Sequence, residues 1–325
     1  MTILDPRYVF QPFEYPEAYD YWLRQQQAHW LHTEVAMASD IHDWNVNLTD
    51  SERNVIGNIL KSFAQTEVIV NDYWSTRVAH WFPKPEIAMM SSAFGNMETV
   101  HAKAYAYLNE SLGLDNFQAF LDEPTAKDKL DSLSFSYGNQ RVGIATSLAV
   151  FSAFTEGVQL FSSFAVLMNF GRFNKLKGVG QIVAFSIKDE SLHSEAGCWL
   201  FRQFIKEFPA VLTPRLRETV LEAARLSIKL EDDFIDKAFE LGPIEGLNPK
   251  DLKQYIRYRT NTKLGDLGFA SNWRNINQES LEAMEWFDFL STGLEHQDFF
   301  SGRVTGYSRG VVDFSTIDWA SSNGY

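Results

Sequence analysis

Hydrophobic residues recur along most of the chain at the three- and four-residue spacing of helices that bury one face. No stretch shows the sustained two-residue alternation of strands joined by hairpin turns. Pro and Gly interrupt the pattern where helices should end, and Thr49 with Glu52 has the spacing of a capping box. The pattern therefore predicts an all-α fold, with helices at about residues 14–30, 50–81, 85–112, 116–122, 127–134, 140–170, 178–207, 213–240, 249–263 and 279–289.

The helical pattern stops near residue 300. The segment 301–325 is rich in glycine and has no apolar stripe, yet it contains Tyr307 and Trp319. Such a composition is typical of a segment that becomes ordered only when it binds something. We therefore predict a helical domain at 1–300 and a flexible C-terminal tail at 301–325.

The most apolar stretch, residues 142–171, contains Glu156 as its only charged residue. It is long enough to span a bilayer. Several serines and Gln159 dilute its apolar character, however, and no other segment resembles it. A helix buried inside a large soluble bundle is therefore favoured over a transmembrane helix. In either environment the carboxylate of Glu156 needs a partner.

Charge and cysteine content exclude several function classes. The formal net charge of −13 disfavours nucleic-acid binding, because an acidic surface repels phosphate backbones. No cationic amphipathic helix is present to hold a membrane surface. The single cysteine, Cys198, cannot form a disulfide within the chain or a cysteine metal site. No signal-peptide pattern occurs at the N-terminus, and a cytoplasmic protein is expected.

Two of the seven histidines lie in the motif Glu-x-x-His, as Glu98 with His101 and as Glu190 with His193. Residues three apart on a helix point the same way, so each pair can bind one ion. The spacing alone is weak evidence, because it also arises by chance. Each pair, however, lies within the apolar stripe of its helix, where the buried face is expected.

Two further carboxylates occupy buried positions. Glu67 lies in the apolar stripe of the predicted helix at 50–81, and Glu156 lies in the apolar stretch described above. Four buried carboxylates without cations would cost many kcal/mol. The alternative is that Lys or Arg side chains in the core pair with these carboxylates. No Lys or Arg lies in the apolar stripes near these positions.

Two divalent ions would balance the four negative charges, and the neutral imidazoles would complete the coordination. This ligand set is that of ferritin-like bundles with two iron or two manganese ions. The sequence therefore predicts a ferritin-like helical bundle with a dinuclear metal site between four core helices.

Three sequence motifs carry a family resemblance: METVHAKAY at 97–105, TEGVQLFSSF at 155–164 and KDESLH at 188–193. With them the chain resembles the small, radical-generating subunit of class I ribonucleotide reductase, from about residue 30 to the tail. The resemblance implies a homodimer with the metal ligands Glu67, Glu98, His101, Glu156, Glu190 and His193.

The same resemblance implies roles for several aromatic residues. Tyr105 matches the tyrosine that many members oxidise to a stable radical, and Trp30 matches a tryptophan linked through Asp189 to a ligand histidine. Tyr307 matches the tail tyrosine that relays the radical to the large subunit, and Trp319 resembles an aromatic residue that docks the tail. Without the resemblance, Tyr105 and Trp30 would be ordinary core residues.

The identity of the metals is suggested by one departure from the common family pattern. Glu67 stands where most small subunits have Asp, while Tyr105 is retained. This combination resembles the dimanganese subgroup, so two manganese ions are preferred. Two irons, or one manganese with one iron, remain as alternatives, although the mixed subgroup replaces the tyrosine with Phe.

The function implied is that of the radical-generating subunit of ribonucleoside-diphosphate reductase. The oxidised metal site would deliver a one-electron hole to a cysteine of the large catalytic subunit, which reduces ribonucleotides. That chemistry needs a cysteine pair in addition, which Cys198 cannot supply, so the active site must lie on another polypeptide. A stand-alone ferritin-like dimetal oxidase is the main alternative, and a metal-storage protein is the third possibility.

Overall fold

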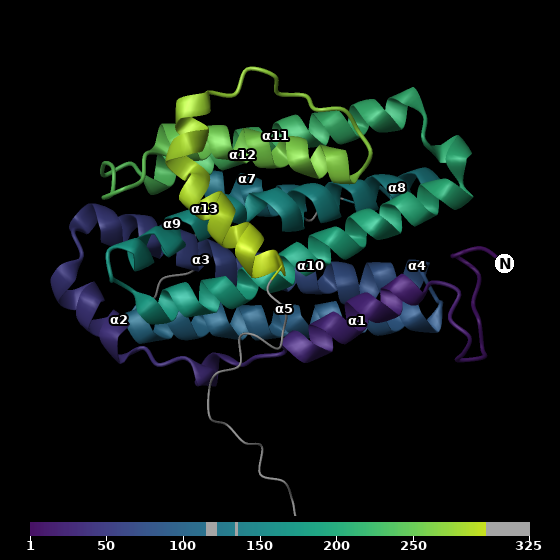
Figure 1. Cartoon of the computed structure of the whole chain (residues 1–325), viewed down its shortest axis with the longest axis horizontal. Coiled ribbons are helices and arrows are strands. Elements are labelled where there is room, and N and C mark those ends of the chain that lie inside the picture. Colours follow the sequence, from purple (N-terminus) through teal and green to yellow (C-terminus); the bar gives the residue numbers. More distant parts are fainter. Residues whose placement is uncertain (115–121, 134–135, 297–325) are drawn as a thin grey trace, which may run out of the picture.

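The structure, a computed structural model, describes residues 1–114, 122–133 and 136–296 (Figure 1). Nearly all of the predicted helix at 116–122 lies outside these residues. The predicted tail, with Tyr307 and Trp319, lies outside them as well.

The described residues are predominantly helical, and their one isolated bridge, between Ile244 and Leu247, is not part of a strand. The predicted all-α fold is therefore confirmed. The helices are α1 (Pro16–Ala28), α2 (Ala38–His42), α3 (Asp50–Asp72), α4 (Ala79–Trp81), α5 (Pro85–Leu112), α7 (Pro124–Leu133), α8 (Arg141–Val150), α9 (Phe161–Arg172), α10 (Lys177–Glu207), α11 (Pro214–Ala238), α12 (Pro249–Asp266) and α13 (Gln278–His296).

Five shorter helical segments join these elements. Three are π-helical: η2 (Asp43–Asn47), η3 (Tyr73–Val78) and η4 (Phe151–Gln159). Two are 3₁₀ turns: η1 (His32–Glu34) and η5 (Pro209–Val211). The predicted helices at 50–81 and 140–170 are thus continuous helical tracts, each containing a π-helical segment that the sequence pattern did not indicate.

Helix ends follow local chemistry. Thr49 and Glu52 form the predicted capping box, in which Glu52 N–H donates to Thr49 Oγ1 over 3.2 Å and Thr49 N–H donates to Glu52 Oε2 over 2.7 Å. Pro85 occupies the first turn of α5, and Gly113 ends that helix with a φ of 67°, a conformation that suits glycine. These signals fix where α3 begins and where α5 begins and ends.

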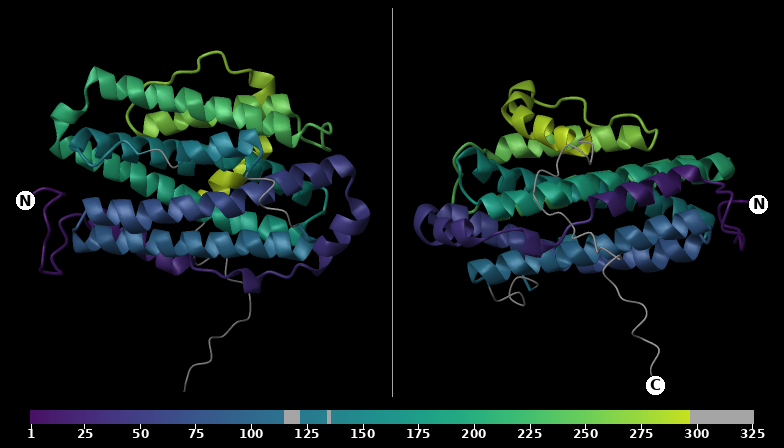
Figure 2. Two further views of the ribbon diagram at one scale, coloured as in Figure 1. Left: turned by 180° about the vertical axis from the view of Figure 1, so that it is seen from behind. Right: turned by 60° about the horizontal axis from the view of Figure 1, so that its bottom comes forward.

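Four helical tracts surround the centre of the molecule: α3, α5, α10 and the tract α8–η4–α9. Helices α3 and α5 lie side by side, as the view from behind shows (Figure 2). The α8–η4–α9 tract packs on α10, and α11 and α12 also pack on this tract. Helix α1 lies along α5 and also contacts α10. The core is therefore deepest where these four tracts meet.

The tract Arg141–Arg172 is, among the described helices, the one that is long and apolar enough to cross a membrane. Its most apolar window is 94% buried inside the structure. Most of its hydrophobic side chains are covered by neighbouring helices of the same chain, although Val142 at its start is 50% exposed. This burial agrees with the predicted core helix.

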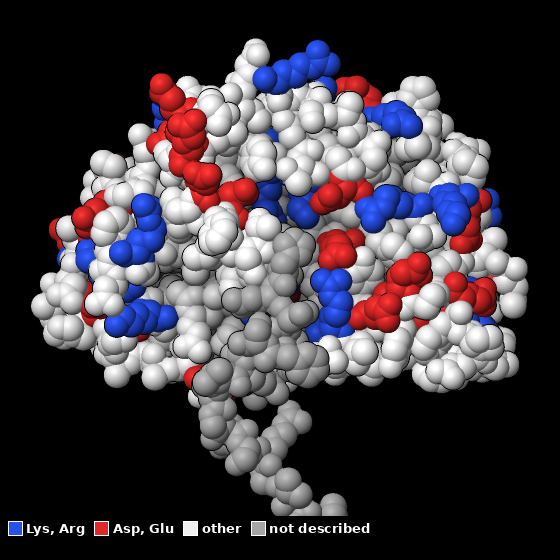
Figure 3. Space-filling view, in the orientation of Figure 1, with Lys and Arg blue, Asp and Glu red and all other residues white. Residues whose placement is uncertain are grey.

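The surface carries charges of both signs. On the face shown in Figure 3, acidic and basic side chains are intermingled. Many of them form ion pairs, such as Arg225 with Glu218 at 2.9 Å and Arg24 with Glu195 at 3.1 Å. Exposed pairs of this kind contribute little to stability, so the energetics of the fold depend on the interior.

Candidate metal centre

The six side chains expected to bind metal meet in the core. Glu67 comes from α3, Glu98 and His101 come from α5, Glu156 comes from η4, and Glu190 with His193 comes from α10. Each of the six is fully buried, with a relative exposure of 0%. Each helix directs them inward because they occupy its apolar stripe, as the sequence pattern predicted.

Their ligand atoms form two adjacent groups, within each of which the atoms all lie within 4.8 Å of one another. The first group is Glu67, Glu98, His101 and Glu190, and the second is Glu98, Glu156, Glu190 and His193. Glu98 and Glu190 belong to both groups. The arrangement therefore has two neighbouring cation positions with two carboxylates between them.

Both histidines turn Nδ1 toward the carboxylates. His101 Nδ1 lies 3.0 Å from Glu98 Oε2 and 3.1 Å from Glu190 Oε1. His193 Nδ1 lies 2.8 Å from Glu98 Oε1 and 3.9 Å from Glu156 Oε2. Imidazole nitrogens and carboxylate oxygens that converge in this way are donors suited to iron or manganese.

Several of these buried oxygens lack a hydrogen-bond donor. Among the described residues, neither oxygen of Glu67 has a hydrogen-bond partner, and the same holds for Glu156 Oε2 and Glu190 Oε2. Glu190 Oε1 has only the nearby Nδ1 of His101 at 3.1 Å. Buried polar atoms without partners are costly. Cations at the two positions would satisfy them, so the residues present fit a dinuclear metal site.

The pKa values of the carboxyl groups also indicate that positive charge is lacking at the site. Burial and the neighbouring charge of Glu98 raise the pKa of Glu67 well above its usual value, and burial with the charge of Glu190 does the same for Glu156. Burial and Glu98 raise the pKa of Glu190 to about 7. Without cations, these groups would therefore tend to hold protons, which bound metals would replace.

A second layer of hydrogen bonds holds His101. Its Nε2 lies 3.0 Å from Asp189 Oδ2, and the same oxygen accepts a 2.8 Å hydrogen bond from Trp30 Nε1. With a metal bound at Nδ1, Nε2 would carry the proton of the neutral imidazole and donate it to Asp189. The three residues Trp30, Asp189 and His101, singled out from the sequence, thus form one hydrogen-bonded chain.

Gln25 on α1 is a residue of the site that the sequence analysis missed. Its Nε2 donates to Asp189 Oδ1 over 2.8 Å, and its Oε1 lies 2.9 Å from His193 Nε2. It is buried, with a relative exposure of 1%. A signal was available, because Gln25 continues the buried stripe of α1 after Ala18 and Tyr21.

Trp74 in η3 is a second missed contact. Its indole Nε1 donates a 2.7 Å hydrogen bond to Glu156 Oε1, and the side chain is fully buried. Since an indole nitrogen can only donate, this contact orients the carboxylate and leaves Glu156 Oε2 directed at the second group of ligands.

Tyr105 lies one turn beyond His101 on α5 and is also fully buried. Its ring centroid is 6.3 Å from that of His101 and 4.7 Å from that of Phe63. Burial and the charge of Glu67 raise the pKa of its phenol well above the usual value. The phenol therefore keeps its proton in the resting protein.

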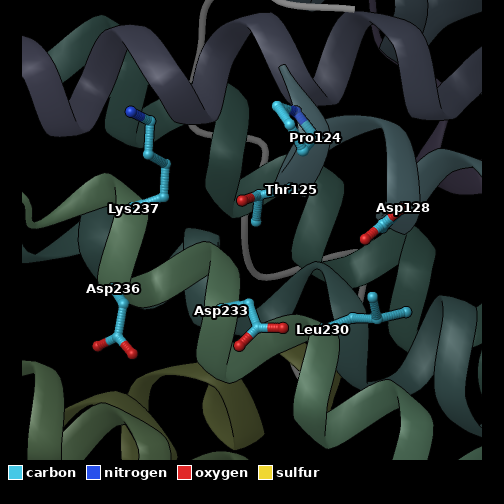
Figure 4. Close-up of a pocket in the computed structure, with 7 residues that line it drawn as sticks. All are labelled: Pro124, Thr125, Asp128, Leu230, Asp233, Asp236 and Lys237. Carbon is cyan, nitrogen blue, oxygen red and sulfur yellow. The ribbon is translucent and has the colours of Figure 1, made fainter. Parts of the chain in front are cut away.

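A pocket of about 340 Å³ between α7 and α11 is separate from this centre (Figure 4). Three aspartates line it, but two of them have cationic partners: Asp233 pairs with Lys229 at 2.7 Å, and Asp236 pairs with Lys253 at 2.6 Å. This surface pocket therefore does not resemble the buried ligand set.

Comparison with known proteins agrees with this geometry. Residues 7–279 match the protein family described as "Ribonucleotide reductase, small chain". The chain is 35% identical to a probable ribonucleoside-diphosphate reductase small subunit of Invertebrate iridescent virus 3, over 343 residues that cover 98% of this chain and 88% of the relative. It is 27% identical to human ribonucleoside-diphosphate reductase subunit M2, over 95% of this chain and 77% of the relative.

Solved structures show the same fold. The dimanganese(II)-NrdF of Streptococcus sanguinis aligns with a TM-score of 0.73 at 18% identity, covering 86% of this chain and 99% of the other. A putative class I ribonucleotide reductase from Bacillus halodurans aligns with a TM-score of 0.71 at 22% identity, covering 84% and 88%. The predicted ferritin-like architecture is confirmed by these likenesses.

Proposed function

Because this chain belongs to the small-chain family of class I ribonucleotide reductase, we propose that its buried centre holds two manganese ions and serves radical generation for ribonucleoside-diphosphate reduction. The observation that carries the proposal is the meeting of four buried carboxylates and two imidazoles, several of whose atoms have no other partner. The proposed ligands are Glu67, Glu98, His101, Glu156, Glu190 and His193.

The preference for manganese rests on Glu67, which replaces the more common Asp while Tyr105 is retained. A structurally similar protein is described as a dimanganese(II) form, which supports this choice. Two irons, or one manganese with one iron, are the alternatives, because carboxylate and imidazole ligands separate these metals poorly. When bound and oxidised, the metal pair supplies a one-electron oxidising equivalent.

The protein's own residues would direct that equivalent. Asp189 accepts hydrogen bonds from both Trp30 and His101, so it fixes the orientation of the imidazole and connects it to the indole. Trp30 would lose the electron, and Tyr307 in the tail would relay the hole to the large subunit. Tyr105 would be the site of any stable tyrosyl radical.

We further propose a homodimer in which the helical domain at 1–300 carries the metals and the tail at 301–325 docks on the large catalytic subunit through Tyr307 and Trp319. The state of Cys198 supports the need for that partner. Burial raises the pKa of its thiol to about 12, so this single cysteine is neither ionised nor accessible for chemistry on a nucleotide.

The test combines metal analysis with electron paramagnetic resonance on protein loaded separately with manganese and with iron. We expect two manganese ions per chain, activity with the large subunit, and loss of metal from Glu156→Ala. Glu86→Gln is the control, since Glu86 is equally buried but pairs with Arg7 away from the centre. Activity only with two irons and a tyrosyl signal would contradict the manganese assignment.

The tail is tested in the same assay. Tyr307→Phe should abolish nucleotide reduction while the metal content stays at the wild-type value. Truncation after residue 300 separates the two candidate functions, because a stand-alone ferritin-like oxidase would keep its activity without the tail. Normal turnover by Tyr307→Phe would refute the assigned relay.

A further inference from the structure

The π-helical segment η4, which carries Glu156, is held by cations from two other helices. Arg259 of α12 donates from Nε to the backbone carbonyl of Gly157 over 2.6 Å. Lys129 of α7 donates from Nζ to the backbone carbonyl of Gln159 over 3.0 Å. These carbonyls lie one and three residues after Glu156. A π-helical segment departs from the regular α-helical hydrogen-bond pattern, so contacts from outside can decide where it lies.

Lys129 is a buried cation with a buried counter-charge. Its Nζ lies 2.6 Å from Glu231 Oε1, and Ser162 donates a hydrogen bond to the other oxygen of that carboxylate. The side chains of Lys129 and Glu231 are 3% and 0% exposed. A buried ion pair of this kind is often no more stabilising than an apolar pair of the same size. Stability alone therefore does not explain the Lys129–Glu231 pair. The hydrogen bond from Lys129 to the Gln159 carbonyl gives the pair a structural role.

The side chain of Arg259 is also held in place, by an aromatic ring and by burial. Its guanidinium lies 3.1 Å from the ring centroid of Phe161, the first residue of α9. The residue is buried, with a relative exposure of 7%. Stacking on the ring restricts the guanidinium, so that its Nε points at the Gly157 carbonyl.

Segment η4 also packs closely against α10, the helix that carries Glu190 and His193. A Cβ on Gly157 would lie 2.7 Å from Ser194 Oγ of α10 and 2.8 Å from Lys263 Cδ of α12. On α10 itself, a Cβ on Gly197 would clash with Ser152 Oγ of η4. The segment is therefore in close contact with α10 and α12 and has the two cations on its carbonyls, so it has little room to shift.

We propose that Lys129 and Arg259 are positioning residues, which fix η4 and thereby direct Glu156 at the second metal position. The inference rests on the proposed two-metal site. It predicts that removing either cation weakens the position made with Glu156 and His193, while the position made with Glu67 and His101 is less affected.

The experiment is a titration of metal-free protein with Mn²⁺ for Lys129→Met and Arg259→Gln, with both binding steps resolved. The step that fills the position made with Glu156 and His193 should lose about tenfold in affinity, the lower end of the effect expected for residues behind metal ligands. Hydrogen exchange of the metal-free variants is measured in parallel. The amides of η4 should exchange faster than in the wild type, while those of α5 should not.

Two further variants make the result decisive. Lys129→Met/Glu231→Gln removes the counter-charge, so it tests the carbonyl contact without leaving an unpaired buried carboxylate. Lys84→Met is the matched control, because Lys84 is also fully buried and pairs with Glu14 at 2.9 Å, away from η4. It should lower stability yet leave the ratio of the two affinities unchanged.

The outcomes separate this inference from the proposed function. If the wild type binds two Mn²⁺ but the Lys129 and Arg259 variants keep the wild-type affinity ratio and the wild-type exchange of η4, the inference is overturned and the proposed function stands. An equal shift of the ratio in Lys84→Met would also overturn it. A wild type that does not bind two Mn²⁺ would overturn both.

Discussion

At the level of single residues, Gln25 connects the two halves of the metal centre. Its amide donates to Asp189, which supports His101, and its carbonyl faces Nε2 of His193. One neutral side chain therefore influences the orientation of both histidines. Partners of this kind fix the tautomer and the direction of a ligand imidazole.

Replacing Gln25 with Leu should therefore weaken metal binding without removing a ligand. We expect a loss of about 10- to 100-fold in Mn²⁺ affinity, as for other residues that support ligand histidines. Competition with a chelator of known affinity would measure it. Gln26→Leu, an exposed position on the same helix, should bind as the wild type does. Unchanged affinity in Gln25→Leu would show that the two hydrogen bonds are dispensable.

At the level of elements, the close approach of α10 to η4 depends on the absence of a side chain at Gly197. Gly197→Ala should push the two elements apart and lower the free energy of unfolding by about 1–3 kcal/mol, as expected for overpacking. Denaturant titration would measure this loss. Gly180→Ala, in the same helix with no heavy atom within 4 Å of its added Cβ, should instead stabilise by up to about 1 kcal/mol. Equal effects of the two substitutions would argue against the close contact.

The long helices and the inward-facing positions of the proposed ligands could be predicted from the sequence, because both follow from one periodic pattern. Glu98 and His101 replace apolar residues in a buried stripe, and so do Glu190 and His193. A stripe reports which side of a helix faces inward, so the burial of these residues follows from the sequence. Their meeting at one level of the bundle depends in addition on how the helices pack.

Other features could not be predicted, because they depend on contacts between distant segments. Gln25 is separated by 164 residues from Asp189, and no motif joins them. The π-helical segment η4 differs from α-helix in its hydrogen bonds, whereas its side chains read as an ordinary apolar run. The hold of Lys129 and Arg259 on backbone carbonyls likewise has no signature, since a carbonyl is present at every residue.

At the level of the whole molecule, the metals should contribute to folding stability as well as to chemistry. In their absence, burial and neighbouring carboxylates raise the pKa of three core carboxyl groups, those of Glu67, Glu156 and Glu190. For the fourth, Glu98, the two histidines outweigh the effect of burial and lower the pKa to about 2. Cations that bind only the folded protein shift the equilibrium toward it.

Removing the metals should therefore lower the thermal stability of the protein. At free Mn²⁺ 100-fold above its Kd, each site should contribute about 2.7 kcal/mol. Scanning calorimetry with a chelator and then with added Mn²⁺ would measure the loss and its recovery. Mg²⁺ at the same concentration is the control and should restore less, because it is less well suited to imidazole. An unfolding temperature independent of Mn²⁺ would contradict a cation site in the core.

The two histidines have different hydrogen-bond acceptors, although their ligand groups mirror each other. Nε2 of His101 faces the carboxylate of Asp189, whereas Nε2 of His193 faces the neutral amide oxygen of Gln25. An anionic acceptor pulls more strongly on the imidazole proton and makes the opposite nitrogen a better electron donor. The two imidazoles of the centre therefore differ in donor strength. The more electron-rich one belongs to His101, on the side of Trp30.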